Sequence, residues 1–166
     1  PNARVRLVRL GLDGTQTEVA WDHDAYPYLA TVEVGEAQTL GAHAVVSVLS
    51  RDQQRQVILA VTAADVTTVS TRECQPWLTL VDGVPCLGPS GELLEVVADA
   101  ATDTFRLVAD GQPFTPPGLQ VTGVAHVSRT GITLTAQADP REHHAFRLDP
   151  AGALVALTRG ESYNLI

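Results

Sequence analysis

The stretch His143–Thr158, HHAFRLDPAGALVALT, decides the fold class because its central motif recurs along the chain. In this motif an aromatic residue is followed by Arg and Leu, and a Gly stands four residues after the Leu. The same arrangement occurs at Phe105–Leu107 with Gly111, and at Val8–Leu10 with Gly14, where Val replaces the aromatic residue. A motif that occurs three times in one chain indicates a repeated structural unit rather than a single site.

The spacing of the copies predicts the kind of unit. A fourth, weaker copy lies at Val57–Leu59, with Ala63 in the Gly position. Counted from the first residue of each copy, the intervals are 49, 48 and 41 residues. A period in the forties is typical of β-propeller blades, each of which is built from four antiparallel strands.

The last repeat shows the four strands of such a blade. Ile132, Leu134 and Ala136 alternate with polar residues, which is the period of a β-strand. This strand follows LQVTGVAHV and precedes HHAFRL and ALVALT, with turns at DPRE and DPAG. In the repeated motif the aromatic residue and the Leu should share one strand face and pack on a neighbouring blade, with the Arg on the other face. The Gly should close the hairpin into the fourth strand, where it can adopt a backbone angle that other residues avoid.

Applied to the whole chain, this pattern predicts an all-β fold, a partial β-propeller of three to four blades, each a four-stranded antiparallel sheet. We expect one partial propeller over residues 1–166. Its predicted segments are the end of one blade at 1–21, blades at 25–71, 77–116 and 119–158, and a tail at 159–166 that enters the next blade.

The composition narrows the function classes. Of the 166 residues, 45% are hydrophobic and 18% are charged, which is enough for a packed core and too apolar for disorder. The net charge is −8, with no basic patch, so we expect no nucleic-acid partner. No apolar run approaches the length of a membrane span and no signal peptide opens the sequence, so we expect no membrane partner and a cytoplasmic location. The first residue, Pro1, suggests a processed or excised start.

Two groups of residues are candidates for a metal site. His143 and His144 are adjacent, but neighbouring strand residues point to opposite faces and cannot share one ion, so we interpret them as ordinary strand positions. Asp22, His23 and Asp24 lack the repeated acidic spacing of a calcium loop, and we predict a solvated turn there. The sequence therefore predicts no metal ligand and no cofactor site.

Catalytic candidates are equally weak. His23 or His126 could be combined with Ser50 or Ser128 and an aspartate into a triad, but such triples arise by chance, and triads are recognised by geometry. We therefore expect no catalytic residue in this chain.

Tryptophan and cysteine residues are predicted to be structural. Trp21 and Trp77 lie where blades begin or end, and we expect packing between blades rather than a carbohydrate platform. Cys74 and Cys86 lack Cys-x-x-Cys spacing, and we expect two buried or half-buried thiols rather than a disulfide or a zinc site.

Three segments resemble successive blades of one known propeller: AYPYLATVEV at Ala25–Val34, SRDQQRQVILAV at Ser50–Val61, and DPREHHAFRLDPAGALVALT at Asp139–Thr158. The resemblance is to the N-terminal propeller of the dipeptidyl peptidase IV branch of the prolyl oligopeptidase family, in its bacterial form. The segment Gly111–Val124 fits the same series.

Within the last segment, Glu142, His144 and Phe146 match a family pattern of alternating Glu, His and aromatic residue. The resemblance implies a propeller of about eight blades followed by an α/β-hydrolase domain, in a serine peptidase that removes N-terminal dipeptides, commonly after Pro or Ala. It also implies that the propeller guides peptides to a buried active site.

The chain departs from this family where the chemistry would lie. The nearest approach to the nucleophile motif G-x-S-x-G is GPSGE at Gly88–Glu92, which we interpret as a turn between strands. The paired glutamates that hold the substrate amine are absent, because no Glu-Glu occurs. We therefore expect a non-catalytic propeller fragment of a hydrolase, with a peptide substrate and an α/β-hydrolase domain as its partners.

Two other functions stay open, because propellers host many. The chain could be a non-catalytic scaffold for protein–protein interaction, or a sensor module that binds a small ligand. A partial ring also leaves blade faces and strand edges uncovered, so we expect the isolated chain to form homo-oligomers through these edges. The tail Glu161–Ile166 is a candidate for a strand that pairs across the break.

Overall fold

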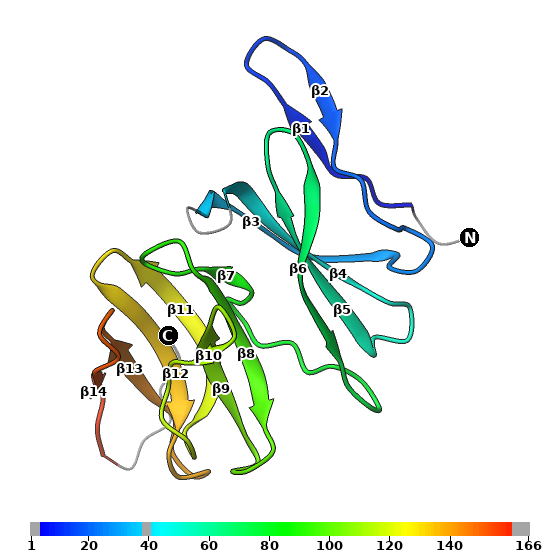
Figure 1. Ribbon diagram of the computed structural model, residues 1–166. Coiled ribbons are helices and arrows are strands. Elements are labelled where there is room, and N and C mark those ends of the chain that lie inside the picture. The colour runs from blue at the N-terminus through cyan, green and yellow to red at the C-terminus, as the bar shows by residue number, and fades with distance from the viewer. Residues whose placement is uncertain (1–3, 38–40, 161–166) are drawn as a thin grey trace. The chain divides into compact units, whose positions relative to one another are not determined.

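The computed structural model describes residues 4–37 and 41–160. Within these ranges the chain forms strands and turns and no helix, and its strands make three four-stranded sheets and one two-stranded sheet (Figure 1). All four sheets are antiparallel. The all-β, partial-propeller fold class that the repeats predict is therefore confirmed. The predicted pairing strand at Glu161–Ile166 lies outside the described residues.

Each sheet is a meander, because its strands lie side by side in the order of the sequence. The two-stranded sheet consists of β1 (Val8–Leu10) and β2 (Gln16–Glu18). The first four-stranded sheet consists of β3 (Tyr28–Ala37), β4 (Ala42–Leu49), β5 (Arg55–Val61) and β6 (Val66–Glu73). The second consists of β7 (Cys86–Leu87), β8 (Leu93–Asp99), β9 (Thr104–Ala109) and β10 (Gln112–Pro113). The third consists of β11 (Gln120–Ser128), β12 (Gly131–Gln137), β13 (His144–Leu148) and β14 (Leu154–Ala156).

The chain divides into two compact units. The first unit, up to Thr79, holds the β1–β2 hairpin and the sheet β3–β6, and the second, from Leu80, holds the sheets β7–β10 and β11–β14. The union of all sheets in one propeller domain, with the predicted blade boundaries, stays a prediction.

The core of the first unit forms between the hairpin and one face of the sheet β3–β6. Val46 and Val48 of β4 share this face with Leu59 of β5, and all three are buried. Val19 and Leu7 cover them from the hairpin side. The N–H of Val19 donates to the carbonyl of Leu7 at 2.9 Å, which extends the pairing of β1 and β2 to the point where the hairpin meets the core.

The core of the second unit lies between its two sheets. Leu107 of β9 belongs to the same buried cluster as Leu134 of β12 and Leu148 of β13, and all three have 0% exposure. Phe105 and Phe146 are partly buried against this cluster. In these two copies of the motif the aromatic residue and the Leu therefore pack between neighbouring sheets, as the period-two pattern predicts.

The motif glycines have the backbone conformation that the sequence predicts. Gly14, Gly111 and Gly152 have φ angles of +85°, +76° and +90°, a region that side chains with a Cβ rarely adopt. The turns differ, however, between copies. After Leu148 the strand ends at once, whereas after Leu107 it continues to a tight turn at Asp110 and Gly111, both with positive φ.

The leucine of the motif can be tested as a core residue. Changing Leu148 to Ala should lower the free energy of unfolding by about 2–5 kcal/mol, because it leaves a cavity between the two sheets. The change is measured by urea titration, with unfolding monitored by far-UV circular dichroism. Leu157→Ala is the matched control, because Leu157 is 53% exposed and its loss should have little effect. Equal effects of the two substitutions would contradict the core assignment.

Candidate functional site

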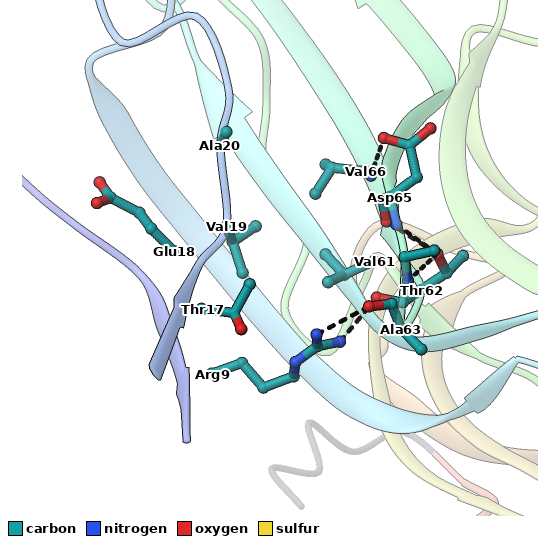
Figure 2. A pocket seen from close by; sticks show the side chains of 11 residues that line it. Arg9, Thr17, Glu18, Val19, Ala20, Val61, Thr62, Ala63, Asp65 and Val66 are labelled. Atoms are coloured by element: carbon teal, nitrogen blue, oxygen red, sulfur yellow. Dashed lines mark hydrogen bonds between the residues drawn. The ribbon is translucent and has the colours of Figure 1, made fainter. Parts of the chain in front are cut away.

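One cavity of the first unit lies between the hairpin and the β5–β6 turn. It has a volume of about 260 Å³ and is lined by Arg9, the segment 17–20 and the segment 61–66. Figure 2 shows Arg9 reaching from β1 to the turn, where Nη1 donates to the carbonyl of Thr62 at 2.8 Å and Nη2 to that of Ala63 at 2.9 Å. The guanidinium thus closes one end of the cavity and ties the hairpin to the sheet.

Glu18, Thr62 and Asp65, which also line this cavity, are already engaged in hydrogen bonds. Glu18 points away from the turn (Figure 2) and accepts Nε of Arg6 at 3.1 Å and Nη2 at 2.7 Å. This hydrogen bond lowers the pKa of Glu18 and raises that of Arg6. Asp65 accepts the N–H of Val66 at 2.8 Å, and the Thr62 hydroxyl donates to the carbonyl of Asp65 at 3.0 Å. The cavity therefore lies where the hairpin is fastened to the sheet. No hydroxyl of its lining donates a hydrogen bond to a side-chain base.

The adjacent histidines are both buried, at 6% exposure for His143 and 8% for His144. Nε2 of His143 lies 2.7 Å from the hydroxyl of Thr122. Nε2 of His144 lies 3.0 Å from Oε2 of Glu142, and its Nδ1 lies 3.1 Å from the hydroxyl of Thr158. The two rings therefore engage different groups, as expected for neighbours that point to opposite faces.

The Glu142–His144 pair belongs to a small network that fastens β14 to β13. The Thr158 hydroxyl, besides bonding His144, accepts the N–H of Ala145 at 3.0 Å. Two residues of the family-like pattern, Glu142 and His144, thus act through hydrogen bonds at the end of the last sheet, while Phe146 packs in the core.

The two serine hydroxyls that could be drawn into a triad are hydrogen-bonded to groups other than histidine. The Ser50 hydroxyl donates to Asp52 at 2.5 Å, and the Ser128 hydroxyl contacts Thr130 and the carbonyl of Gly131, each at 3.1 Å. Both hydroxyls hold turns. The ring of His23 lies on Trp21 instead, with 3.9 Å between ring centroids.

The acidic segment before β3 is a turn. Oδ1 of Asp22 accepts the N–H groups of Asp24 at 3.1 Å and Ala25 at 2.9 Å, and the carbonyl of Asp22 accepts the N–H of Tyr26 at 2.9 Å. These bonds use the carboxylate to cap the chain reversal. No group of three or more potential metal ligands occurs in the part of the chain that the structure describes.

The remaining candidates divide between core and surface. Trp21 packs on the core of the first unit and donates Nε1–H to the carbonyl of Tyr26 at 2.9 Å, whereas Trp77 is 62% exposed. Cys86 is a buried thiol as expected, but Cys74 is exposed, which differs from the expectation that both are at least half-buried.

The segment resembling a nucleophile motif is a turn, as predicted. Between β7 and β8, the N–H of Gly88 donates to the carbonyl of Glu92 at 2.8 Å, and the N–H of Gly91 donates back to the carbonyl of Gly88 at 3.0 Å. The Glu92 carboxylate accepts the N–H of Ser90 at 2.8 Å. Ser90 therefore belongs to a hairpin between two strands, and not to the strand-to-helix turn that an esterase or peptidase nucleophile requires.

Comparison with known proteins finds a similar structure and no similar sequence. No family model matches the chain, and no curated protein matches it in sequence. The chain is similar to the crystal structure of Porphyromonas gingivalis dipeptidyl peptidase 4, with a TM-score of 0.63 over 93% of this chain and 13% sequence identity. The two share a fold. The chain spans 23% of the length of that protein, and an identity this low shows the fold alone.

A membrane-spanning helix is not among the elements of residues 4–37 and 41–160.

The Ser50–Asp52 pair should make stability depend on pH. The hydrogen bond from Ser50, with a further one from the N–H of Gln54, lowers the pKa of Asp52 below its ordinary value of 3.8. The carboxylate therefore stabilises the fold above that value, and the contribution is lost as the pH falls through the lowered pKa. Asp52→Asn should reduce the urea midpoint at pH 7 and have a smaller effect near pH 2. An effect of the same size at both pH values would contradict this role. Asp24→Asn, at an exposed turn position, is the control.

The Thr158 hydroxyl can be tested with two substitutions. Thr158→Val removes the acceptor of the buried Ala145 N–H and should destabilise the protein by about 1–3 kcal/mol, because a buried donor loses its partner. Thr158→Ser keeps the hydroxyl and should restore most of the stability. Thermal unfolding at pH 7 measures both. Equal melting temperatures for the two variants would contradict this role of the hydroxyl, because Val lacks the hydroxyl and Ser keeps it.

Proposed function

We propose that this chain is the non-catalytic propeller portion of a serine dipeptidyl peptidase, in which it gates and shapes the cavity that receives the substrate. The parent reaction is the removal of dipeptides from peptide N-termini, with a preference for Pro or Ala in the second position. The observation that carries this proposal is the structural likeness to a dipeptidyl peptidase 4 over 93% of the chain.

The segments that resemble the family also support the proposal, and they fall on strands and turns of two sheets: the first two on the sheet β3–β6 and the third on the sheet β11–β14. Ala25–Val34 covers the entry into β3, Ser50–Val61 covers the β4–β5 turn and β5, and Asp139–Thr158 covers β13 and β14. The residue pattern of these segments reflects strand pairing and turns. Their resemblance to the family is therefore a resemblance in propeller architecture.

The hydrogen bonding of the described residues fits a structural role, in which the chain shapes the cavity and takes no part in catalysis. Ser50, Ser90 and Ser128 hold turns, and the carboxylates beside them accept backbone or hydroxyl hydrogens instead of orienting a histidine. A chain with this use of its polar groups can exclude bulky substrates and leave hydrolysis to an α/β-hydrolase domain. By the same resemblance, that domain and the peptide substrate are the proposed partners, and the cytoplasm is the proposed location.

The proposal is tested on the whole protein that contains this chain. It should hydrolyse a dipeptide nitroanilide such as Ala-Pro-nitroanilide, and a fluorophosphonate should label it and abolish this activity, as for a serine nucleophile. The N-acetylated substrate is the matched control, because a dipeptidyl peptidase requires a free amine. The 166-residue chain alone should show neither activity nor labelling.

The gating role has its own readout. An unfolded peptide of 10 to 20 residues with an Xaa-Pro N-terminus should be shortened by two residues, whereas a folded protein with the same N-terminus should not. A whole protein that is not labelled and releases no dipeptide would overturn the proposal. Cleavage of the folded substrate at the same rate would overturn the gating role alone.

A further inference from the structure

A second cavity of the first unit lies at one end of the sheet β3–β6, where β5 begins and β6 ends. It has a volume of about 250 Å³ and is lined by Gln54, Arg55, Glu73, Cys74 and Gln75. This volume is below the range of about 300–1,000 Å³ that is usual for the pockets of drug-sized ligands. An occupant of this cavity must therefore be small.

Two opposite charges line this cavity without neutralising each other. Arg55 and Glu73 are directly opposite each other on neighbouring antiparallel strands, where opposite charges attract. Among the described residues, however, neither the Arg55 guanidinium nor the Glu73 carboxylate forms an ion pair or a hydrogen bond. The guanidinium lies over the ring of Tyr26 instead, with Cζ 5.8 Å from the ring centroid. Each of the two charged groups can still bind a group of the opposite charge.

The two glutamine side chains of the lining fix each other's orientation. Nε2 of Gln75 donates to Oε1 of Gln54 at 2.8 Å. Gln54 therefore offers the N–H groups of its amide, and Gln75 offers the oxygen of its amide. The lining thus contains a cation and a donor for a negative group, together with an anion and an acceptor for a positive group.

Backbone hydrogen bonds hold this lining in place. The N–H of Cys74 donates to the carbonyl of Gln54 at 2.9 Å, and the N–H of Leu78 donates to the carbonyl of Gln53 at 2.8 Å. These bonds join the β4–β5 turn to the segment that follows β6. A site whose backbone is already ordered loses less conformational freedom when a ligand binds.

We propose that this cavity binds a free α-amino acid. The α-carboxylate accepts hydrogen bonds from the Arg55 guanidinium, whose planar fork matches the two carboxylate oxygens, and from the amide of Gln54. The α-ammonium group donates to the Glu73 carboxylate and to the amide oxygen of Gln75. Each charge of the ligand then meets an opposite charge in the lining.

A zwitterion is favoured over a ligand with a single charge. An anion would lie beside the Glu73 carboxylate and would be repelled by the net charge of −8, whereas a cation would leave Arg55 unmatched. A neutral polyol would leave both charges without a counter-charge. Because Arg55 and Glu73 are exposed to solvent, their interactions are screened, and we expect a dissociation constant of about 0.1–10 mM.

The first test titrates the ¹⁵N-labelled chain with L-alanine and follows the Nε–H signal of Arg55 and the side-chain amide signals of Gln54 and Gln75 by NMR. N-acetyl-L-alanine, which lacks the ammonium group, and L-alaninamide, which lacks the carboxylate, are the matched ligands. Each should bind about tenfold more weakly than L-alanine, because each loses a charge-assisted interaction.

Two results of this titration would overturn the proposal. One is the absence of any shift up to about 100 mM L-alanine, well above the expected dissociation constant. The other is equal binding of L-alanine and either matched ligand, because this would identify a site for a single charge.

The second test uses variants of the two charged residues. Arg55→Gln and Glu73→Gln should each raise the dissociation constant for L-alanine about tenfold. Both residues are exposed, so both variants should fold. Arg51→Gln is the matched control, because it removes the same charge from the neighbouring turn and Arg51 does not line the cavity. An equal effect of Arg51→Gln and Arg55→Gln, or no effect of either cavity variant, would overturn the assignment.

Cys74 reports where the ligand binds, because its thiol is exposed whereas that of Cys86 is buried. Saturating L-alanine should slow the alkylation of Cys74 by iodoacetamide at pH 7, and the same concentration of L-alaninamide should not. An unchanged rate at saturation would place the ligand elsewhere and overturn the site. The inference does not depend on the proposed peptidase function, because none of these tests involves catalysis.

Discussion

The structure depends on one constraint: because the described residues form no helix, a β-sheet of this chain can bury its apolar face only against another sheet or a hairpin. In the second unit, Leu107 and Leu148 stand on facing sheets in one buried cluster, and both have 0% exposure. In the first unit, Leu59 of β5 is covered by Val19 and Leu7 of the hairpin. Because the apolar residues alternate along each strand, each sheet has an apolar face, and the core of each unit forms where two such faces stack. The turns bring each strand back beside the previous one.

The arginine of the repeated motif has a role that the sequence indicates only in part. Arg9, Arg106 and Arg147 each donate from the guanidinium to a backbone carbonyl in a turn, namely those of Thr62, Thr115 and Thr130. The carbonyls of turns lack strand partners, and a guanidinium with five N–H groups on a long stem can reach them. The motif therefore combines a core residue, a turn fastener and a turn glycine within seven positions, which explains why it recurs.

The polar residues of the chain are used in the same way. Asp22, Asp52 and Asp149 accept backbone N–H groups of their own turns, and the hydroxyl of Thr158 connects β13 to the end of β14. Glu142 and His144 join the same network. These carboxylates, the imidazole and the hydroxyl thus hold turns and strand ends together.

The sequence by itself determined the fold class, the strand positions and the turn glycines, because these depend on local alternation and on backbone angles that few residues adopt. It also indicated that the side chains of His143 and His144 lie on opposite faces of a strand, and it identified GPSGE as a turn. It did not determine which faces are covered: Val8–Leu10 has the pattern of a buried strand, yet Leu10 is exposed and Leu148 is not. Nor did it reveal the carbonyl partners of Arg9, the network around Thr158 or the exposure of Cys74. Those were decided by the tertiary structure, because cover and partners come from residues that are distant in the sequence and are brought together only when the sheets stack.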